Sequence, residues 1–370
     1  MKKVLVLLVA LAMALTLTAC SGKKDPEPKP DDPTPVETGY DIAFLADLGT
    51  INDGGFNQGT WEGCQKYAKE KNMTVNYLQP AEDSDDARKT ILRQAVEQWK
   101  AKVCVACGYL WDNALAELCP TYPDVKFIFI DGDSSVEGIA NVAPICFKEQ
   151  EVGFLAGYAA VKDGYKNLAF FGGMGVPAVV RFGYGFVWGA DYAAQELGLS
   201  DINIKYWYSG SFDPTPEKMT TVSSWYETGT EIVFSCGGTI VQSAIQAAEA
   251  GEGRYLIGVD IDESHKSERI VTSAMKSITN ATYDGIVAAI GGGDWSKFSG
   301  KVIAYGTENN GVQLPDDFSR FKSFTKAEYE AIFADLAADK DGISSSIPTD
   351  ATTDRADKLP VKAVHIEDLD

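Results

Sequence analysis

Histidine is almost missing from this chain, because only His265 and His365 occur among its 370 residues. Basic clusters are missing too, and 53 acidic residues against 33 lysines and arginines give a formal net charge of −20. With so few histidines and one closely spaced cysteine pair, Cys104 and Cys107, a structural zinc site is disfavoured. A chain this acidic is a poor candidate for binding nucleic acid or anionic lipid, so we interpret the charge as a solvated surface.

Catalytic motifs are also scarce. The sequence has no G-x-S-x-G elbow, no H-E-x-x-H pair and no G-x-x-x-x-G-K-[ST] loop. Residues 173–178 approximate a dinucleotide-binding loop, but Pro177 interrupts it. A segment that starts at Asp260 begins like a calcium loop, yet His265 replaces the glycine of position six and Val271 the glutamate of position twelve. We therefore expect no catalytic residue, no metal ion and no cofactor.

The sequence contains only one long apolar run. Residues 4–19 follow two lysines and are apolar apart from Thr16 and Thr18. This run is too short for a stable membrane-spanning helix and is typical of an export signal. It ends in Leu-Thr-Ala-Cys20, which resembles a bacterial lipobox. We expect a signal peptide over 1–20 and a lipidated Cys20 that anchors the protein to the outer face of the cell membrane. The alternative is an ordinary signal followed by a chance cysteine.

Residues 21–39 are proline-rich and charged, and this composition predicts a disordered tether. The roughly 330 residues that follow exceed what one core usually holds, so two lobes are expected. Six further cysteines are scattered through predicted strands and helices, and we interpret them as buried free thiols, with their pairing left open. They are Cys64, Cys104, Cys107, Cys119, Cys146 and Cys236.

Apolar strands alternate with helical segments along the chain. The expected strands are one that starts at 42 and ends at 46–47, and 74–78, 103–107, 125–130, 168–171, 202–207, 232–235, 255–259 and 302–305. The expected helices are 60–71, 85–99, 113–119, 148–161, 183–196, 215–227, 241–250, 281–291 and 326–338. Such alternation is typical of parallel sheets with helices on both faces. The sequence therefore predicts an α/β fold of two doubly wound parallel-sheet lobes that face each other across a ligand cleft.

The stretch 40–64 contains the most informative strand end. Its strand is followed by Asp47, by a glycine-rich loop, and then by Phe56 and Asn57 near the start of a helix. Open α/β sheets bind ligands at the carboxyl edge of their strands, so these three side chains are candidate binding residues. An aromatic face, a carboxylate and an amide suit a flat, polar molecule that carries hydroxyl groups. The alternative is a turn in which Asn57 caps the helix and Phe56 belongs to the core.

Other strands end in the same kinds of residue. Asp131 and Asp260 each follow an apolar strand, and glycine loops follow two others, at 172–175 and at Gly237 and Gly238. Parallel sheets bring such positions to one edge, so together they predict a ligand site. Helix capping and turn formation explain any one of these aspartates equally well.

Several segments taken together resemble one known family. They occur in order over residues 41–280, and each is modest alone. They include Asp53-Gly-Gly-Phe56-Asn57-Gln58, Phe127-Ile-Phe-Ile-Asp131, Phe147-Lys-Glu-Gln-Glu-Val-Gly153, Gly173-Met-Gly-Val-Pro177, Arg181-Phe182, Gly210-Ser-Phe212-Asp213, Gly237-Gly238-Thr239, Ile257-Gly-Val-Asp260 and Thr272-Ser273-Ala-Met-Lys276. With the lipobox, they resemble the basic membrane protein family of lipoproteins, the substrate-binding components of ABC importers for purine nucleosides.

The resemblance implies a type I periplasmic-binding-protein fold in which the chain crosses between the lobes three times. The N-terminal lobe is then expected to comprise 40–145 and about 276–322, and the C-terminal lobe 146–275 and about 323–370. The implied event is lobe closure around a purine nucleoside, without catalysis. A monomer anchored outside the cell membrane would pass this ligand to an ABC transporter permease.

The resemblance also implies roles for the candidate residues. Phe56 would stack on the purine, and Asn57 and Asp131 would form hydrogen bonds with the edge of the purine ring. Asp260 and Lys276 would hold the ribose hydroxyls through charge-assisted hydrogen bonds. The alternative for Lys276 is a surface lysine without a role.

A second aromatic wall is expected opposite Phe56, with Asp47 and the backbone of Gly237 and Gly238 nearby. Four rings are in contention for this wall, and the first two are preferred: Phe186, Phe234, Trp111 and Phe212.

Other functions remain open on the sequence. A binding protein of the same fold for a sugar or another small molecule would have the same strands and lipobox. An extracellular nucleoside hydrolase would release free base, although its usual calcium-binding aspartate cluster near the amino terminus is not recognisable. A lipoprotein partner of a surface sensor is a further alternative to an importer component.

Overall fold

The computed structural model describes residues 39–350 and 355–369, which belong to one unit that runs from Thr38 to Asp370. The predicted signal peptide 1–20, the expected lipidation at Cys20 and nearly all of the predicted tether lie outside the described residues. Within 39–350 and 355–369, no helix combines the length and the apolar content needed to cross a bilayer.

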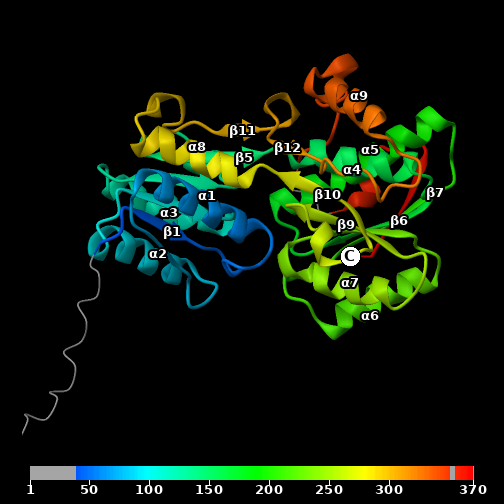
Figure 1. The fold of residues 1–370 in the computed structure, drawn as a ribbon, viewed down its shortest axis with the longest axis horizontal. Helices are drawn as coiled ribbons and strands as arrows, with labels where there is room; N and C mark the ends of the chain where they lie inside the picture. Colours follow the sequence, from blue (N-terminus) through cyan, green and yellow to red (C-terminus); the bar gives the residue numbers. More distant parts are fainter. Residues whose placement is uncertain (1–38, 351–354, 370) are drawn as a thin grey trace, which may run out of the picture. The chain divides into compact units, whose positions relative to one another are not determined.

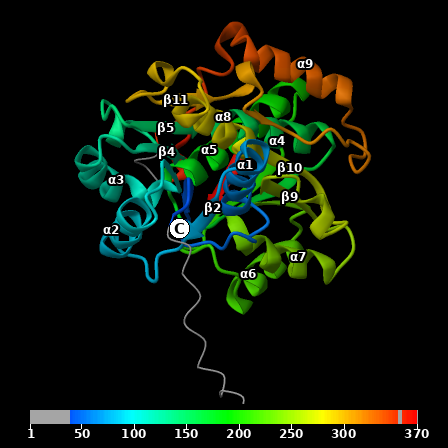
Figure 2. The ribbon, with the colours of Figure 1, turned by 60° about the vertical axis from the view of Figure 1, so that its left-hand side comes forward.

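The first sheet has six parallel strands in the order β11-β5-β4-β3-β1-β2. They are β1 (Ile42–Leu45), β2 (Val75–Leu78), β3 (Val103–Cys107), β4 (Lys126–Ile130), β5 (Val142–Phe147) and β11 (Ile303–Tyr305). Successive side chains of a strand point to opposite faces, so each apolar run serves two layers. The face of Phe44 packs against α1 (Phe56–Lys71) and α8 (Ile278–Ile290), which lie side by side in Figures 1 and 2. The face of Leu45 packs against α2 (Asp85–Arg93) and α3 (Asp112–Leu118).

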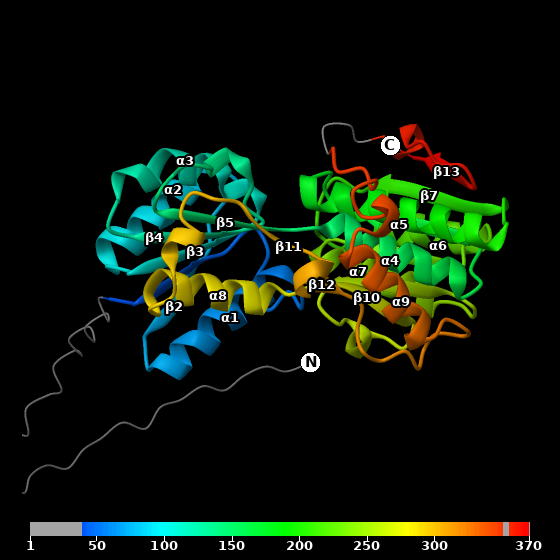
Figure 3. The same cartoon turned by 90° about the horizontal axis from the view of Figure 1, so that it is seen from above.

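The second sheet has seven strands in the order β12-β10-β9-β8-β6-β7-β13, and only the pairing of β12 with β10 is antiparallel. They are β6 (Asn167–Gly172), β7 (Ile202–Tyr208), β8 (Ile232–Cys236), β9 (Tyr255–Asp260), β10 (Ile270–Lys276), β12 (Val312–Gln313) and β13 (Val364–Asp368). Figure 3 shows β13 beside β7 at the sheet edge.

Helices cover both faces of the second sheet. One face packs against α4 (Glu149–Lys162) and α5 (Pro177–Leu197), and the other against α6 (Pro216–Glu227) and α7 (Val241–Glu249), while α9 (Lys326–Ala337) packs on the outer side of α4. Figure 1 shows these two helical layers above and below the sheet. We call the first sheet with its helices the first lobe, and the second sheet with its helices the second lobe.

The two lobes repeat one strand order. The run β2-β1-β3-β4-β5 of the first sheet matches the run β7-β6-β8-β9-β10 of the second. Local details follow the same correspondence: β4 is followed by Asp131 and β9 ends at Asp260, and both aspartates adopt a left-handed backbone. Gly108 after β3 and Gly237 after β8 both have positive φ, and each precedes a short 3-10 turn.

The predicted fold class is confirmed, since both sheets are doubly wound and almost wholly parallel. The strand predictions omit β5, β10, β12 and β13, and the single helix expected over 85–99 divides into α2 and a π-helical turn at Gln94–Gln98.

The chain returns to the second sheet between Tyr305, where β11 ends, and Val312, where β12 begins. This return precedes the lobe boundary expected near residue 322.

Glycines allow α4 and α5 to pack backbone against backbone. A Cβ atom added to Gly157 of α4 would lie 2.0 Å from the carbonyl oxygen of Phe186, and one added to Gly189 of α5 would lie 2.0 Å from that of Phe154. Gly153 and Gly185 make equally close approaches one turn away. Because backbone cannot yield as a flexible side chain does, this spacing fixes the position of α5 relative to α4.

We predict that Gly157→Ala lowers the free energy of unfolding by about 1–3 kcal/mol, because the added methyl group forces the two helix backbones apart. Denaturant unfolding followed by circular dichroism measures this difference. Gly175→Ala is a matched control, since a Cβ atom there has its nearest neighbour at 3.8 Å. Equal stability of the two variants would contradict the packing argument.

Candidate functional site

A cavity of about 190 Å³ lies between the carboxyl ends of the strands of the two sheets. Its walls are formed by loops that follow strands of both sheets, by the first turns of α1 and α5, and by the ends of β9 and β10. The lining includes Asp47, Asp53, Phe56, Tyr109, Asp131, Met174, Phe182, Phe212, Asp213, Gly237, Gly238, Asp260 and Lys276. A cavity of this kind at the strand ends of open sheets suits a small molecule.

Most of the ligand-binding residues expected from the sequence line this cavity. They are Asp47, Phe56, Asp131, Gly237, Gly238, Asp260 and Lys276. The other three, Asn57, Phe186 and Phe234, are buried and do not belong to the lining. Among the described residues, no group of three or more histidine, cysteine, aspartate or glutamate side chains is placed to hold a metal ion.

Lys276 is buried at the centre of a charge network, with 2% of its side chain exposed. Its Nζ donates to both carboxylate oxygens of Asp131 at 2.9 Å, and it lies 3.3 Å from Glu149 Oε1 and 3.8 Å from Asp260 Oδ1. The same Nζ lies 4.7 Å from the centroid of the Phe56 ring. The interpretation of Lys276 as a surface lysine is therefore wrong.

The pKa values of these groups follow from burial and from one another. Burial alone would lower the pKa of Lys276, but the surrounding carboxylates outweigh it and raise the pKa, so the ammonium stays charged. Burial raises the pKa of Asp260 to about 7, although the nearby Lys276 opposes the shift. Burial likewise raises the pKa of Asp47 to about 6. Within the described part of the chain, Oδ1 of Asp47 is a buried oxygen without a hydrogen-bond partner.

Asp131 and Asp260 reach this network through an unusual backbone conformation. Their φ angles are 60° and 67°, in the left-handed region that aspartate tolerates better than most residues. Such conformations cost of order 1 kcal/mol or more and persist where the surroundings impose them, often at functional sites. Here the preceding strand holds the backbone of each aspartate, and Lys276 attracts its carboxylate.

Glu149 and Arg181 belong to this network although sequence reasoning gave them no role. Glu149, the first residue of α4, is fully buried, and its Oε2 accepts a 2.7 Å hydrogen bond from Arg181 Nε. Neither residue belongs to the cavity lining. Acids that directly precede a long apolar run, as Glu149 and Glu151 do in α4, are the sequence signal that could have indicated a buried acid in need of cationic partners.

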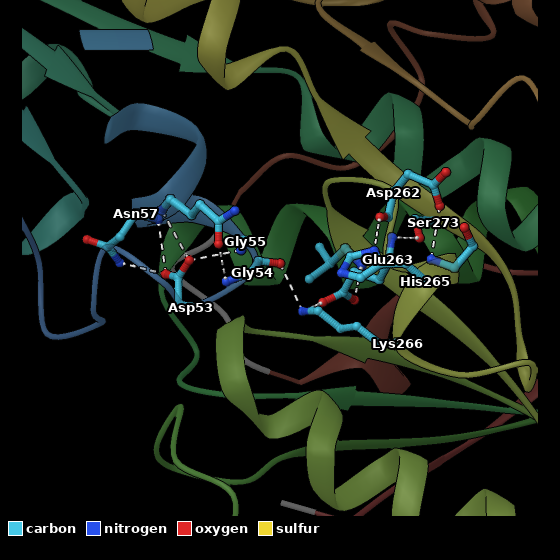
Figure 4. A network of polar contacts seen from close by, with 12 residues as sticks. Asp53, Gly54, Gly55, Asn57, Asp262, Glu263, His265, Lys266 and Ser273 are labelled. Atoms are coloured by element: carbon cyan, nitrogen blue, oxygen red, sulfur yellow. Dashed lines mark hydrogen bonds and ion pairs between the residues drawn. The ribbon is translucent and has the colours of Figure 1, made fainter. Parts of the chain in front are cut away.

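Asn57 holds the loop between β1 and α1 instead of facing the cavity. Its Oδ1 accepts from the backbone N–H of Asp47 at 3.0 Å, and its Nδ2 donates to Asp53 Oδ2 at 3.0 Å. Asp53 also accepts from the N–H groups of Gly55, Asn57 and Gln58 and so caps α1 (Figure 4). The side chains of Asn57 and Asp53 thus fix the positions of Asp47 and Phe56.

The two rings preferred for a wall opposite Phe56 do not line the cavity. Phe186 and Phe234 are fully buried and contact each other at 5.4 Å between centroids, in the core between α5 and the second sheet. Phe182, one turn earlier on α5, and Phe212, in the loop after β7, belong to the lining.

Phe212 lies directly against two glycines. Cβ atoms added to Gly173 and Gly237 would come within 2.3 Å and 2.8 Å of its ring. These glycine loops therefore make room for the ring of Phe212.

Two doubly wound lobes with a cavity between their strand ends define a two-lobed binding protein of the type I periplasmic kind. Solved structures share this fold. An ABC transporter solute-binding protein from Aeropyrum pernix K1 superposes with a TM-score of 0.68 at 23% identity, over 84% of this chain and 87% of that one. A sugar transporter protein from Clostridium phytofermentans superposes with a TM-score of 0.55 at 13% identity, over 75% and 99%.

The chain belongs to the Bmp family, described as ABC transporter substrate-binding protein PnrA-like, because the family profile matches residues 41–336. This result confirms the resemblance seen in the sequence.

Named relatives support the assignment. The ABC transporter nucleoside-binding protein BmpA of Lactococcus lactis is 28% identical over 75% of this chain and 82% of its own length. Basic membrane protein A1 of Borrelia garinii is 31% identical over 62% and 67%. A relative from Pyrococcus abyssi, named as an uncharacterized lipoprotein, is 27% identical over 77% and 72%.

We predict that the ligand-free protein melts a few degrees higher at pH 5.5 than at pH 8. The pKa values of Asp47 and Asp260 rise from an ordinary 3.8 to about 6 and about 7 on folding. Between about pH 4 and about pH 7 the folded protein therefore binds more protons than the unfolded chain. The stabilisation that comes from protonating these two carboxyl groups is complete below about pH 4 and is lost as the pH rises through about 7. Scanning calorimetry across this range measures the effect.

Asp260→Asn should reduce the difference between the two melting temperatures, because asparagine does not titrate. Asp316→Asn is a matched control at an exposed acid. If Asp260→Asn leaves the full pH difference in place, Asp260 does not carry the shift assigned to it.

Proposed function

We propose that this protein captures purine nucleosides outside the cell membrane and delivers them to the permease of an ABC importer, anchored by a lipid on Cys20. The observation that carries the proposal is a single cavity in which aromatic rings, carboxylates and one ammonium converge from both lobes. The nucleoside-binding relative and the relative named as a lipoprotein support the ligand class and the anchor.

In this proposal the purine stacks between two rings. Phe56 provides one wall, and Phe212 replaces Phe186 and Phe234 as the second, because Phe212 belongs to the lining and those two do not. Asp131 accepts from the edge of the base. Asn57 acts indirectly, because its amide already bonds Asp47 and Asp53.

The ribose is assigned to the carboxylates beside Lys276. Vicinal hydroxyls donate to Asp260, and the Lys276 ammonium donates to their oxygens. Oδ1 of Asp47, which is buried and has no partner among the residues that the structure describes, is a further acceptor for a hydroxyl group. The backbone of Gly237 and Gly238 contributes the adjacent wall.

The charge of the cavity favours a ligand without phosphate. One ammonium, Lys276, faces five carboxyl groups in the lining: Asp47, Asp53, Asp131, Asp213 and Asp260. Above the pKa values of Asp47 and Asp260 this excess of negative charge repels an anion. A neutral nucleoside avoids the repulsion that a nucleotide would meet.

Lobe closure completes the proposal. We assign residues 40–145 with the segment around α8 and β11 to one moving lobe, and residues 146–275 with the chain from β12 onward to the other. Contacts from both lobes favour the closed state, so binding requires no chemical step. The functional unit is proposed to be a monomer.

We predict micromolar or tighter binding of guanosine, adenosine or inosine in isothermal titration calorimetry at pH 8, corresponding to about 8 kcal/mol or more. GMP should bind at least about 100-fold more weakly than guanosine, because its phosphate meets the acidic lining. Ribose and galactose test the alternative of a sugar-binding protein.

Two outcomes would contradict this proposal. Heat with a sugar and none with any nucleoside would favour the sugar-binding alternative. Release of free base from guanosine over hours, followed by chromatography, would favour a hydrolase.

We predict that Phe56→Ala and Phe212→Ala each weaken nucleoside binding about 10- to 100-fold, since base stacking on an aromatic ring is worth about 1–3 kcal/mol. Phe212→Tyr keeps the ring and should bind nearly as tightly as the natural protein. Phe321→Ala is a matched control, since its ring packs against Phe318 and Phe324 rather than lining the cavity. Full affinity in Phe212→Ala would remove Phe212 from the second wall.

A further inference from the structure

A hydrogen bond outside the cavity joins the two lobes. Lys266 lies in the turn between β9 and β10 of the second lobe, and its Nζ donates to the carbonyl oxygen of Gly54 at 2.9 Å. Gly54 belongs to the loop between β1 and α1 of the first lobe, and Figure 4 shows the contact. Neither residue belongs to the lining of the cavity.

The lysine is held rigidly on its own lobe. Lys266 Nζ also donates to Glu263 Oε1 at 2.5 Å, and Glu263 is almost fully buried. The other oxygen of Glu263 accepts from the backbone N–H of Val259, while its own N–H donates to Ser273. Three hydrogen bonds from Arg320 to backbone carbonyls pin the rest of the turn.

The acceptor is held just as firmly on the first lobe. Gly54 has φ +63°, a left-handed conformation that suits glycine, and its N–H donates to Gln58 Oε1. Its neighbours are fixed by the bonds that Asp53 accepts from the start of α1. Because both partners are fixed before they meet, the bond costs little conformational entropy when the lobes come together.

We propose that Lys266 is an affinity-determining residue that acts by holding the two lobes together and never touches the ligand. The inference rests on the proposed capture of a small ligand by lobe closure. Apparent affinity is the intrinsic affinity multiplied by the fraction of protein in the binding-competent state. A charge-assisted bond that forms only when the lobes meet raises that fraction for every ligand alike.

This mechanism has a signature that distinguishes it from a contact with the ligand. Loss of a cavity residue changes affinities unequally, because each ligand uses that residue differently. Loss of the Lys266–Gly54 bond should weaken all ligands by the same factor, about three- to tenfold, and leave their ranking unchanged. The ligand-free protein should also become more open.

The experiment compares Lys266→Met with the double variant Lys266→Met/Glu263→Gln. The double variant removes the buried carboxylate that the single change leaves without its cation. Lys297→Met is a matched control at an exposed lysine. Calorimetry with guanosine, adenosine and inosine measures affinity, and small-angle X-ray scattering without ligand measures the radius of gyration.

We expect both Lys266 variants to show the uniform loss of affinity and a larger radius of gyration than the natural protein and Lys297→Met. Unequal losses among the nucleosides, a loss confined to the single variant, or an unchanged radius of gyration would overturn the inference. If no nucleoside binds the natural protein, the proposed function fails, and the scattering comparison alone decides the role of Lys266.

Discussion

The ammonium of Lys276 is the interaction on which the cavity depends. A buried cation must be matched by nearby acids, and Lys276 meets this requirement with Asp131 from the first sheet, Asp260 from the second and Glu149 from the start of α4. Glu149 and Lys276 lie where the chain crosses between the lobes, after β5 and at the end of β10, and Asp131 and Asp260 lie at the ends of the neighbouring strands β4 and β9. The single charge of Lys276 therefore contacts the carboxyl edges of both sheets and the start of α4, which follows the connection from the first sheet to the second lobe.

The fold was largely predictable because most strands are short apolar runs followed by helices with clear patterns. The missed strands fail this pattern for physical reasons. β5 contains Pro144, which normally argues against a central strand, and β10 carries Thr272, Ser273 and Lys276 although it is almost fully buried. Ser273 and Lys276 find their partners, the backbone N–H of Glu263 and the carboxylate of Asp131, only through the tertiary fold, so periodicity alone could not reveal β10.

The site was predictable to the extent that strand ends determine it. Asp47, Asp131 and Asp260 reach the cavity because parallel sheets align their carboxyl edges. The direction in which a side chain points from a helix or loop depends on packing, so the sequence could not show that Phe212 lines the cavity while Phe186 and Phe234, the preferred rings, are buried in the core. The pair of Glu149 with Arg181 joins residues 32 positions apart in the chain and has no local signal.

The shared strand order of the two sheets pairs each central strand of one lobe with a strand of the other, so that β4 corresponds to β9 and β5 to β10. Asp131 and Asp260 follow this correspondence, but the ends of β5 and β10 differ. Phe147 ends β5 and Lys276 ends β10, and Lys276 Nζ lies 5.1 Å from the centroid of the Phe147 ring. Of these two strand ends only Lys276 lines the cavity, so its ammonium is offered from one side alone and a molecule with two chemically different ends is held in one orientation.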